Sequence, residues 1–272
     1  LGSAVNMFRS SSHRSPGTAP ASSSSGGASV CNTPAMLAAD SAAVTVASRK
    51  QANVDSAVAE LANCGGRSFG IVADVRDQVS LQGLFESIRS EYGRLDVLIN
   101  NAGGSPSADA ASASPRFHEG IIRLNLIAPL NVAQQANLLM QTQAEGGCIV
   151  FIGSISGLRA SPGTAAYGAA KAGVLALVQS LAAEWAPKVR VVAVSPGLVR
   201  TELAHVHYGD EAGIAAVSAG IPAGRMAVPE DIGNACLYIA SALAAYASGC
   251  NLLLHGGGER PAYLGAAQVA PH

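Results

Sequence analysis

LDVLINNAG, residues 95–103, predicts a short buried strand that runs directly into a turn of small residues. An uninterrupted apolar run bounded by turn residues is typical of a strand that is buried on both faces of a parallel sheet. A second such run, residues 148–153, ends immediately before Ser154. Because ligands bind at the carboxyl ends of the strands in open α/β sheets, both turns are expected to border one cleft.

Strand and helix patterns alternate on both sides of these two runs. Strands are predicted at residues 43–47, 69–73, 97–99, 149–152, 189–194 and 252–254. Between them, apolar residues recur at helical spacing, as in the series Leu81, Leu84, Phe85, Ile88 and Tyr92, and longer helical stretches are expected around residues 117–142, 164–186 and 229–245. Regular strand–helix alternation predicts an α/β fold, a Rossmann-like, doubly wound parallel sheet in a single domain.

Composition limits the partners of the chain. Its 272 residues are 49% hydrophobic, which is enough for one domain with a substantial core, and the net charge of -1 gives no electrostatic reason to bind nucleic acid or an anionic membrane. We identify neither an uninterrupted apolar stretch of membrane-spanning length nor a signal sequence, and expect a cytoplasmic protein. The five cysteines are widely spaced and the six histidines lack ligand spacing, so no metal site is expected.

Tyr167 and Lys171 are four residues apart in a predicted helix and therefore share one of its faces. Both side chains are expected to project into one cleft. An ammonium beside a phenol favours the phenolate and is expected to lower the pKa of Tyr167 toward the working pH. Ser154 lies thirteen residues upstream, at the end of a predicted strand. This grouping is typical of proton transfer coupled to hydride transfer at a carbonyl.

With these residues, the chain resembles the short-chain dehydrogenase/reductase family, in its single-domain branch, from about residue 43 to residue 257. The resemblance rests on residues 100–103 (Asn-Asn-Ala-Gly), Asn125, Ser154, Tyr167, Lys171, residues 195–197 (Ser-Pro-Gly) and Thr201, all in the family's order. It implies that Tyr167 exchanges a proton with the carbonyl oxygen and that Lys171 tunes Tyr167 and holds the nicotinamide ribose. It also implies that Ser154 hydrogen-bonds the same oxygen and that Asn125 holds a water on a proton path. The alternative for Asn125 is a helix-interior amide bonded to backbone.

The resemblance also implies a nicotinamide cofactor. Ser48 and Arg49 follow the strand predicted at residues 43–47, at the place where NAD-preferring proteins carry a carboxylate. This favours NADP(H) over NAD(H), since a guanidinium can bind a phosphate with two hydrogen bonds. An exposed charged strand end is the alternative. The remaining implied cofactor contacts are Gly26, Gly27, Asp74, Val75, Asn101, Ala102, Gly103, Pro196, Gly197, Val199 and Thr201. The alternative for Asp74 is a helix cap.

The front of the chain departs from this pattern. A dinucleotide-binding unit needs a first strand and then a glycine turn, but residues 8–28 carry no apolar run and include Pro16 and Pro20. We divide the chain into an irregular N-terminal segment, residues 1–34, a dinucleotide-binding and catalytic domain, residues 35–260, and a tail, residues 261–272. An out-of-frame reading or gene-model error and genuine divergence both explain the segment. Genuine divergence predicts weaker cofactor binding, with a substitute such as residues 3–8 in place of the missing strand.

Other functions fit less well. Residues 153–157, Gly-Ser-Ile-Ser-Gly, are not the G-x-S-x-G turn of a hydrolase, and sugar epimerases of related fold need a larger C-terminal substrate domain. An NADP(H)-dependent oxidoreductase acting on a small-molecule ketone, 3-oxoacyl carbonyl or secondary alcohol is the favoured function, and a non-enzymatic member unable to bind cofactor is the alternative. Residues 202–227 are expected to form a lid over the substrate. The family resemblance implies a homodimer or homotetramer packed through the Tyr167 helix, although its stripe of Val174, Leu177, Val178 and Leu181 equally fits the core.

Overall fold

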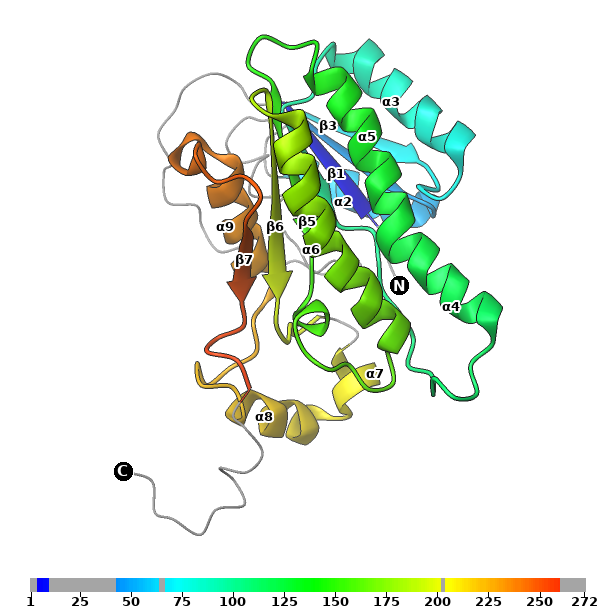
Figure 1. Cartoon of the computed structure of the whole chain (residues 1–272), viewed down its shortest axis with the longest axis vertical. Coiled ribbons are helices and arrows are strands. Elements are labelled where there is room, and N and C mark those ends of the chain that lie inside the picture. Colours follow the sequence, from blue (N-terminus) through cyan, green and yellow to red (C-terminus); the bar gives the residue numbers. More distant parts are fainter. Residues whose placement is uncertain (1–3, 10–42, 64–66, 202–203, 260–272) are drawn as a thin grey trace.

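A computed structural model of the chain describes residues 4–9, 43–63, 67–201 and 204–259. Its centre is one seven-stranded sheet with the order β3-β2-β1-β4-β5-β6-β7 (Figure 1). The strands are β1 (Ala4–Arg9), β2 (Ala43–Ser48), β3 (Arg67–Val72), β4 (Val97–Asn100), β5 (Gly147–Ile152), β6 (Val189–Pro196) and β7 (Asn251–Leu254). Each strand predicted from residue 43 onward is present, which confirms the Rossmann-like α/β fold.

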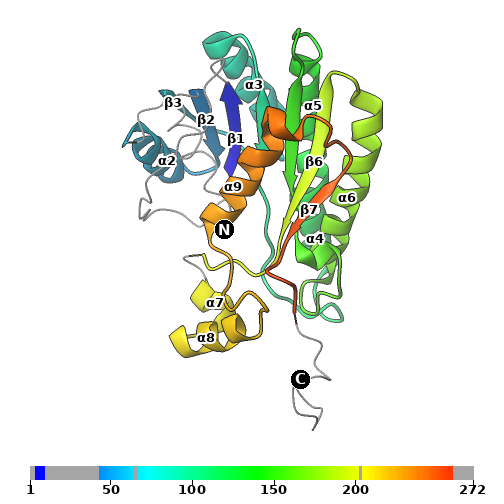
Figure 2. The ribbon, with the colours of Figure 1, turned by 90° about the vertical axis from the view of Figure 1, so that its left-hand side faces the viewer.

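Strand β1 departs from the expected all-parallel sheet. It lies in the middle of the sheet (Figure 2) and pairs antiparallel with both β2 and β4, whereas the other neighbours are parallel. Ala4 lies opposite Ser48 at the end of β2, and Arg9 lies opposite Ala43 at its start. The edges of β2 and β4 that face β1 carry backbone N–H and C=O groups that need hydrogen-bond partners. An antiparallel strand can satisfy these groups as well as a parallel strand can.

The reversal of β1 changes where the chain goes next. A parallel β1 would deliver the following residues to the edge where β2 and β4 end, at Ser48 and Asn100. The antiparallel β1 instead leaves the sheet at the opposite edge, where β2 begins. Arg9 therefore lies about five residues, or roughly 17 Å, from the edge that carries the expected site.

Helices cover both faces of the sheet (Figure 2). On one face, α3 (Gln78–Tyr92), α5 (Ala128–Met140) and α6 (Ala165–Trp185) bury their apolar sides in one core cluster. On the other, α2 (Gln51–Asn63) and α9 (Pro229–Ala240), followed by the short η3 (Ala242–Ala244), pack against β2, β5 and β6. Strands buried between two helical layers explain the uninterrupted apolar runs of the sequence.

The helix expected around residues 117–142 is divided into three parts. It comprises α4 (Pro115–Ile122), a π-helical turn η1 (Arg123–Ile127), and α5. Ser114 caps α4, its hydroxyl accepting a hydrogen bond from the Phe117 N–H at 3.2 Å. Single π turns inside helices widen the coil locally and occur frequently at functional sites. Here the turn contains Asn125, whose side chain is fully buried.

Helix α6 is long and apolar enough to cross a membrane by length and composition, although it is not an uninterrupted apolar stretch. This is weak evidence for a membrane span, because core helices of globular proteins pass the same test. The stripe formed by Val174, Val178 and Leu181 is buried against the sheet, which supports its assignment to the core. Leu177 is partly buried beside it.

The segment beyond β6 folds into two short helices at the carboxyl edge of the sheet, α7 (Ala204–Tyr208) and α8 (Glu211–Ala219). Their small core of Ala204, Ile214, Ile221 and Met226 is separate from the two clusters that flank the sheet. Asp210 caps α8 by accepting a hydrogen bond from the Gly213 N–H. The region expected to form a lid thus packs as a small unit of its own.

Candidate active site

Ser154, Tyr167 and Lys171 come together at the carboxyl end of β5. Ser154 follows the strand and begins the 3-10 turn η2 (Ile155–Gly157), while Tyr167 and Lys171 lie in the first two turns of α6. The turn and the helix touch closely: a Cβ on Gly157 would lie 2.7 Å from the Lys171 carbonyl carbon. The Ser154 hydroxyl lies near enough to the Tyr167 phenol to influence its pKa, and the Lys171 Nζ lies 5.6 Å from the centroid of the Tyr167 ring.

Burial dominates the proton affinities of this cluster. It raises the pKa of Tyr167, and the nearby Ser154 hydroxyl opposes that change. Lys171 is buried, and desolvation lowers its pKa from 10.5 to about 8. The expected lowering of the Tyr167 pKa by Lys171 is therefore not found. The Lys171 Nζ donates a hydrogen bond to the Ile152 carbonyl at 2.7 Å, and the desolvation of the phenol is the largest cause of the raised pKa of Tyr167.

Asn125 lies beside Lys171, with Gly103 between them. A Cβ on Gly103 would lie 2.7 Å from the Asn125 Oδ1 and 3.5 Å from the Lys171 Nζ, so only glycine fits at this position without a shift. The Asn125 Oδ1 accepts a hydrogen bond from the Gly104 N–H at 2.8 Å, and its Nδ2 donates to the carbonyls of Gly104 and Ile121. Asn125 thus holds the turn after β4, and Gly104 is a partner that the sequence did not single out.

The ends of β2 and β3 form the neighbouring part of the edge. Ser48 is buried, whereas Arg49 and the following Lys50 are exposed. Asp74 is bound by both prongs of the Arg76 guanidinium, at 2.9 and 2.6 Å, and this contact lowers the pKa of Asp74 to about 2, with a smaller contribution from Arg49. The Asp74 carboxylate is therefore already partnered, which the sequence did not indicate. Val75, beside it, is buried.

The end of β6 closes the site on the other side. Pro196 ends the strand, and a Cβ on Gly197 would lie 2.9 Å from the Cα of His255. Val199 forms an isolated bridge with Ala227, and Thr201 is partly buried. Asn101 and Ala102 lie in the turn after β4, Ala102 being buried. Gly26 and Gly27 lie outside the described residues.

A nicotinamide cofactor fits this edge in part. The side-chain-free cradle at Gly103 lies between the Asn125 Oδ1 and the Lys171 Nζ, and the buried Asn100 Oδ1 at the end of β4 has no hydrogen-bond partner among the described residues. The exposed cations after β2 suit a phosphate. The antiparallel β1 brings its amino end, Ala4, to this edge beside Ser48. The residues expected to hold the pyrophosphate lie outside the described ranges.

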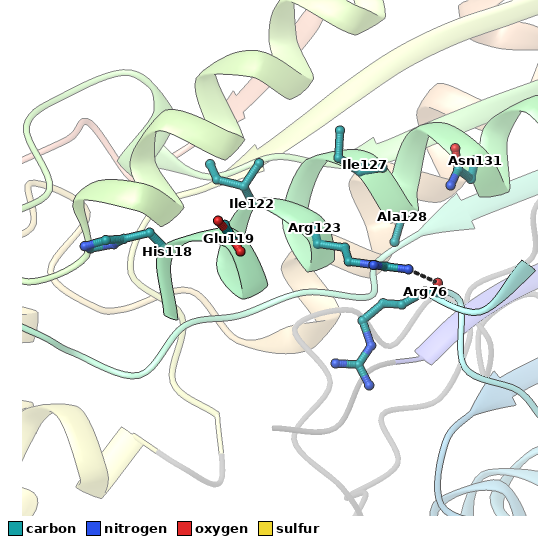
Figure 3. A pocket seen from close by; sticks show the side chains of 8 residues that line it. All are labelled: Arg76, His118, Glu119, Ile122, Arg123, Ile127, Ala128 and Asn131. Atoms are coloured by element: carbon teal, nitrogen blue, oxygen red, sulfur yellow. Dashed lines mark hydrogen bonds between the residues drawn. The ribbon is translucent and has the colours of Figure 1, made fainter. Parts of the chain in front are cut away.

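A wide hollow of about 540 Å³ lies apart from this cluster, along α4, η1 and the start of α5 (Figure 3). Its walls include Arg123, Ile127 and Asn131. The Arg123 guanidinium donates a hydrogen bond to the Arg76 carbonyl at 3.1 Å, and the Arg76 guanidinium points away from it. Two residues of the π turn thus bind neighbouring segments. Arg123 is bonded to the turn that carries Asp74, and Asn125 is bonded to Gly104.

The fold and the site define a class of single-domain α/β proteins with a Ser, Tyr and Lys cluster at the carboxyl edge of the sheet. A family profile described as Enoyl-(Acyl carrier protein) reductase matches residues 28–259. The chain belongs to the short-chain dehydrogenase/reductase family, oxidoreductases that act on CH–OH groups with NAD(P). The expected fold class and enzyme class are thereby confirmed.

Individual relatives agree with this assignment. The 3alpha-hydroxysteroid dehydrogenase of Mediterraneibacter gnavus is 35% identical over 76% of the chain and 83% of its own length. The 3-oxoacyl-[acyl-carrier-protein] reductase of Escherichia coli is 33% identical over 71% and 78%. A solved structure described as a short-chain dehydrogenase/reductase from Burkholderia xenovorans aligns with a TM-score of 0.79 and 30% identity over 86% of the chain and 91% of its own. An uncharacterized relative from Sinorhizobium fredii is longer, and the chain spans 37% of its length.

Proposed function

We propose that this protein is an NADP(H)-dependent oxidoreductase that interconverts a ketone, or a 3-oxoacyl-type carbonyl, and a secondary alcohol. The observation that carries the proposal is the cluster of Ser154, Tyr167 and Lys171 at the edge where α/β folds bind ligands. The relatives named for hydroxysteroid oxidation and 3-oxoacyl reduction support this range of substrates.

In the direction of reduction, Tyr167 donates its phenolic proton to the carbonyl oxygen as the alcohol forms. Ser154 donates a hydrogen bond to the same oxygen and stabilises the charge that develops on it. Lys171 stabilises the phenolate that remains. Burial raises the pKa of Tyr167, so the phenol is protonated at neutral pH, the form in which it acts as the acid in reduction.

Asn125 contributes through the turn after β4. Its amide nitrogen uses both protons on backbone carbonyls, and its oxygen accepts one hydrogen bond, which leaves one lone pair free for a water. We propose that this lone pair holds the water that returns a proton from solvent toward Lys171. Asn125 then has both of the roles considered from the sequence.

The cofactor supplies or accepts the hydride when it is bound. We propose that Arg49 with Ser48 holds the 2′-phosphate, that Val75 packs on the adenine, and that Asp74 receives the adenine amino group on lone pairs that Arg76 leaves free. Further contacts are assigned to Asn101, Ala102, Gly103, Tyr167, Lys171, Pro196, Gly197, Val199 and Thr201. The absence of a carboxylate at residues 48–50 supports NADP(H) over NAD(H).

Exchange of Tyr167 for Phe tests the proposal. Loss of the general acid is expected to reduce ketone reduction by about 10²- to 10⁴-fold while NADPH binding is retained. Tyr246→Phe is the matched control, because this side chain is fully exposed and far from the cluster in the sequence. Turnover by Tyr167→Phe within about twofold of the wild type would show that the proton comes from elsewhere.

A second candidate function, a folded family member that does not bind cofactor productively, is favoured by the reversed strand β1. We predict NADPH binding weaker than micromolar, because the carboxyl end of β1, after which a glycine turn would directly begin, lies at the edge of the sheet opposite the site. Titration of NADPH into protein of verified intact mass tests this, and micromolar affinity would refute it. A one-base shift upstream of residue 43 that restores an apolar strand and a Thr-Gly-x-x-x-Gly-x-Gly motif would assign the segment to a reading error.

We further propose a cytoplasmic homodimer or homotetramer. The exposed side of α6 carries Ala169, Ala172 and Ala176, small side chains that permit close packing of a second copy. Sedimentation of the purified protein tests the assembly. A monomer at micromolar concentration would exclude it.

A further inference from the structure

A cavity of about 340 Å³ adjoins the catalytic cluster on the side of β7. Ile155, which directly follows Ser154, forms one wall, and Gly197 and Leu198, which follow β6, form another. The cavity therefore lies beside the carbonyl position proposed for the substrate. Its far wall comes from the chain after β7, through residues 257–259.

Two charged side chains line this cavity, Arg159 from the loop before α6 and Glu259 from the segment after β7. The Arg159 Nη2 lies 2.5 Å from the Glu259 Oε1, and the Arg159 Nη1 donates a hydrogen bond to the Ala160 carbonyl. Among the described residues, the Glu259 carboxylate is the only acidic partner found for this guanidinium. Both side chains are more than one third exposed, so the pair contributes little to stability and its carboxylate is exchangeable.

The path of the chain brings Glu259 back over the cavity. Gly256, Gly257 and Gly258 have φ values of 61°, 95° and 91°, a run of left-handed backbone that side chains strongly disfavour. The Gly258 N–H is bonded to the His255 carbonyl at 2.9 Å, which closes this turn. Glu259 thus reaches Arg159, one hundred residues away in the sequence.

We infer that Arg159 recognises a carboxylate on the substrate, and that Glu259 occupies the same guanidinium when no substrate is bound. The inference rests on the proposed function and narrows its substrate class to an oxo acid and the corresponding hydroxy acid. The carbonyl lies at Ser154 and Tyr167, the connecting chain lies between Ile155 and Leu198, and the carboxylate lies at Arg159. A guanidinium already paired with a carboxylate has the geometry that this exchange requires.

Matched acids and esters test the inference. The probes are 4-oxopentanoate, 5-oxohexanoate and 6-oxoheptanoate, each with its uncharged methyl ester, and binding to the full chain is measured calorimetrically without cofactor. We expect one acid to bind about tenfold more tightly than its ester. Arg159→Met should remove this difference, while Glu259→Gln should strengthen acid binding several-fold and leave ester binding unchanged.

Arg67→Met and Glu91→Gln are the control variants, because they break a comparable exposed Arg–Glu pair at the start of β3, outside the cavity. They should leave the acid-to-ester ratio unchanged. Equal binding of every acid and its ester by the wild type and by Glu259→Gln would overturn the inference, as would a preference that survives in Arg159→Met.

Turnover separates this inference from the proposed function. NADPH-dependent reduction of the neutral esters tests the oxidoreductase activity without involving Arg159. Failure to reduce any ester or acid, together with Arg159-dependent acid binding, would contradict the proposed activity and support the carboxylate site. Reduction of acids and esters with equal kcat/KM would support the activity and overturn the inferred substrate class.

Discussion

Exchange of the buried Lys171 for Met is predicted to stabilise the fold at neutral pH, and the gain should shrink in alkali. Burial lowers the pKa of Lys171 from 10.5 to about 8. The unfolded chain therefore binds this proton more tightly than the folded protein does. Between pH 8 and 10.5 the unfolded chain keeps a proton on Lys171 that the folded protein has lost. The free energy of unfolding of the wild type should therefore rise with pH across this range.

The magnitude follows from the two pKa values. Relative to a neutral side chain, Lys171 costs about 3 kcal/mol of folding free energy at pH 7 and about 1 kcal/mol at pH 10. Methionine has similar length and no charge. The loss of the hydrogen bond to the Ile152 carbonyl lowers the stability of Lys171→Met by an amount that changes little with pH. The stability difference between variant and wild type should therefore fall by about 2 to 3 kcal/mol between pH 7 and pH 10.

Urea unfolding at several pH values, followed by circular dichroism, measures this difference directly. Lys188→Met is the control, because Lys188 is exposed and its exchange removes a charge without removing a desolvated one. A stability difference that stays constant from pH 7 to pH 10 would refute the reasoning, since it would mean that Lys171 titrates alike in the folded and unfolded states.

Four further substitutions test the cofactor edge and the backbone. Arg49→Ala should raise the NADPH dissociation constant about tenfold and change that of NADH by less than about twofold, measured by titration. Gly103→Ala should lower kcat/KM at least about tenfold with the fold retained, because a methyl group there would lie 2.7 Å from the Asn125 Oδ1. Gly146→Ala should cost about 3 kcal/mol or more in urea unfolding, since φ is 67° and a Cβ would lie 1.8 Å from a backbone carbonyl oxygen. Gly83→Ala, in open space on α3, should instead stabilise by about 1 kcal/mol, and equal effects of these two glycine exchanges would contradict the steric argument.

Much of the fold was predictable because it depends on local patterns. Apolar runs placed β4 and β5 within one or two residues, and the helical spacing of Leu81 through Tyr92 placed α3. The π turn around Asn125 was not predictable, because its neighbours continue a helical pattern without interruption. The Asp74–Arg76 pair was missed as well, although a carboxylate and a guanidinium two residues apart in a turn are a local signal.

The sequence by itself determined the strand–helix alternation and the placing of Tyr167 and Lys171 on one helix face, since periodicity and i, i+4 spacing are properties of short segments. Only the tertiary structure decided the direction of β1, because either direction satisfies the backbone groups of β2 and β4. It also decided the proton affinities of the cluster, which depend on how much water the surrounding segments exclude. The contact between Arg159 and Glu259 likewise needs the whole fold, which brings together side chains one hundred residues apart.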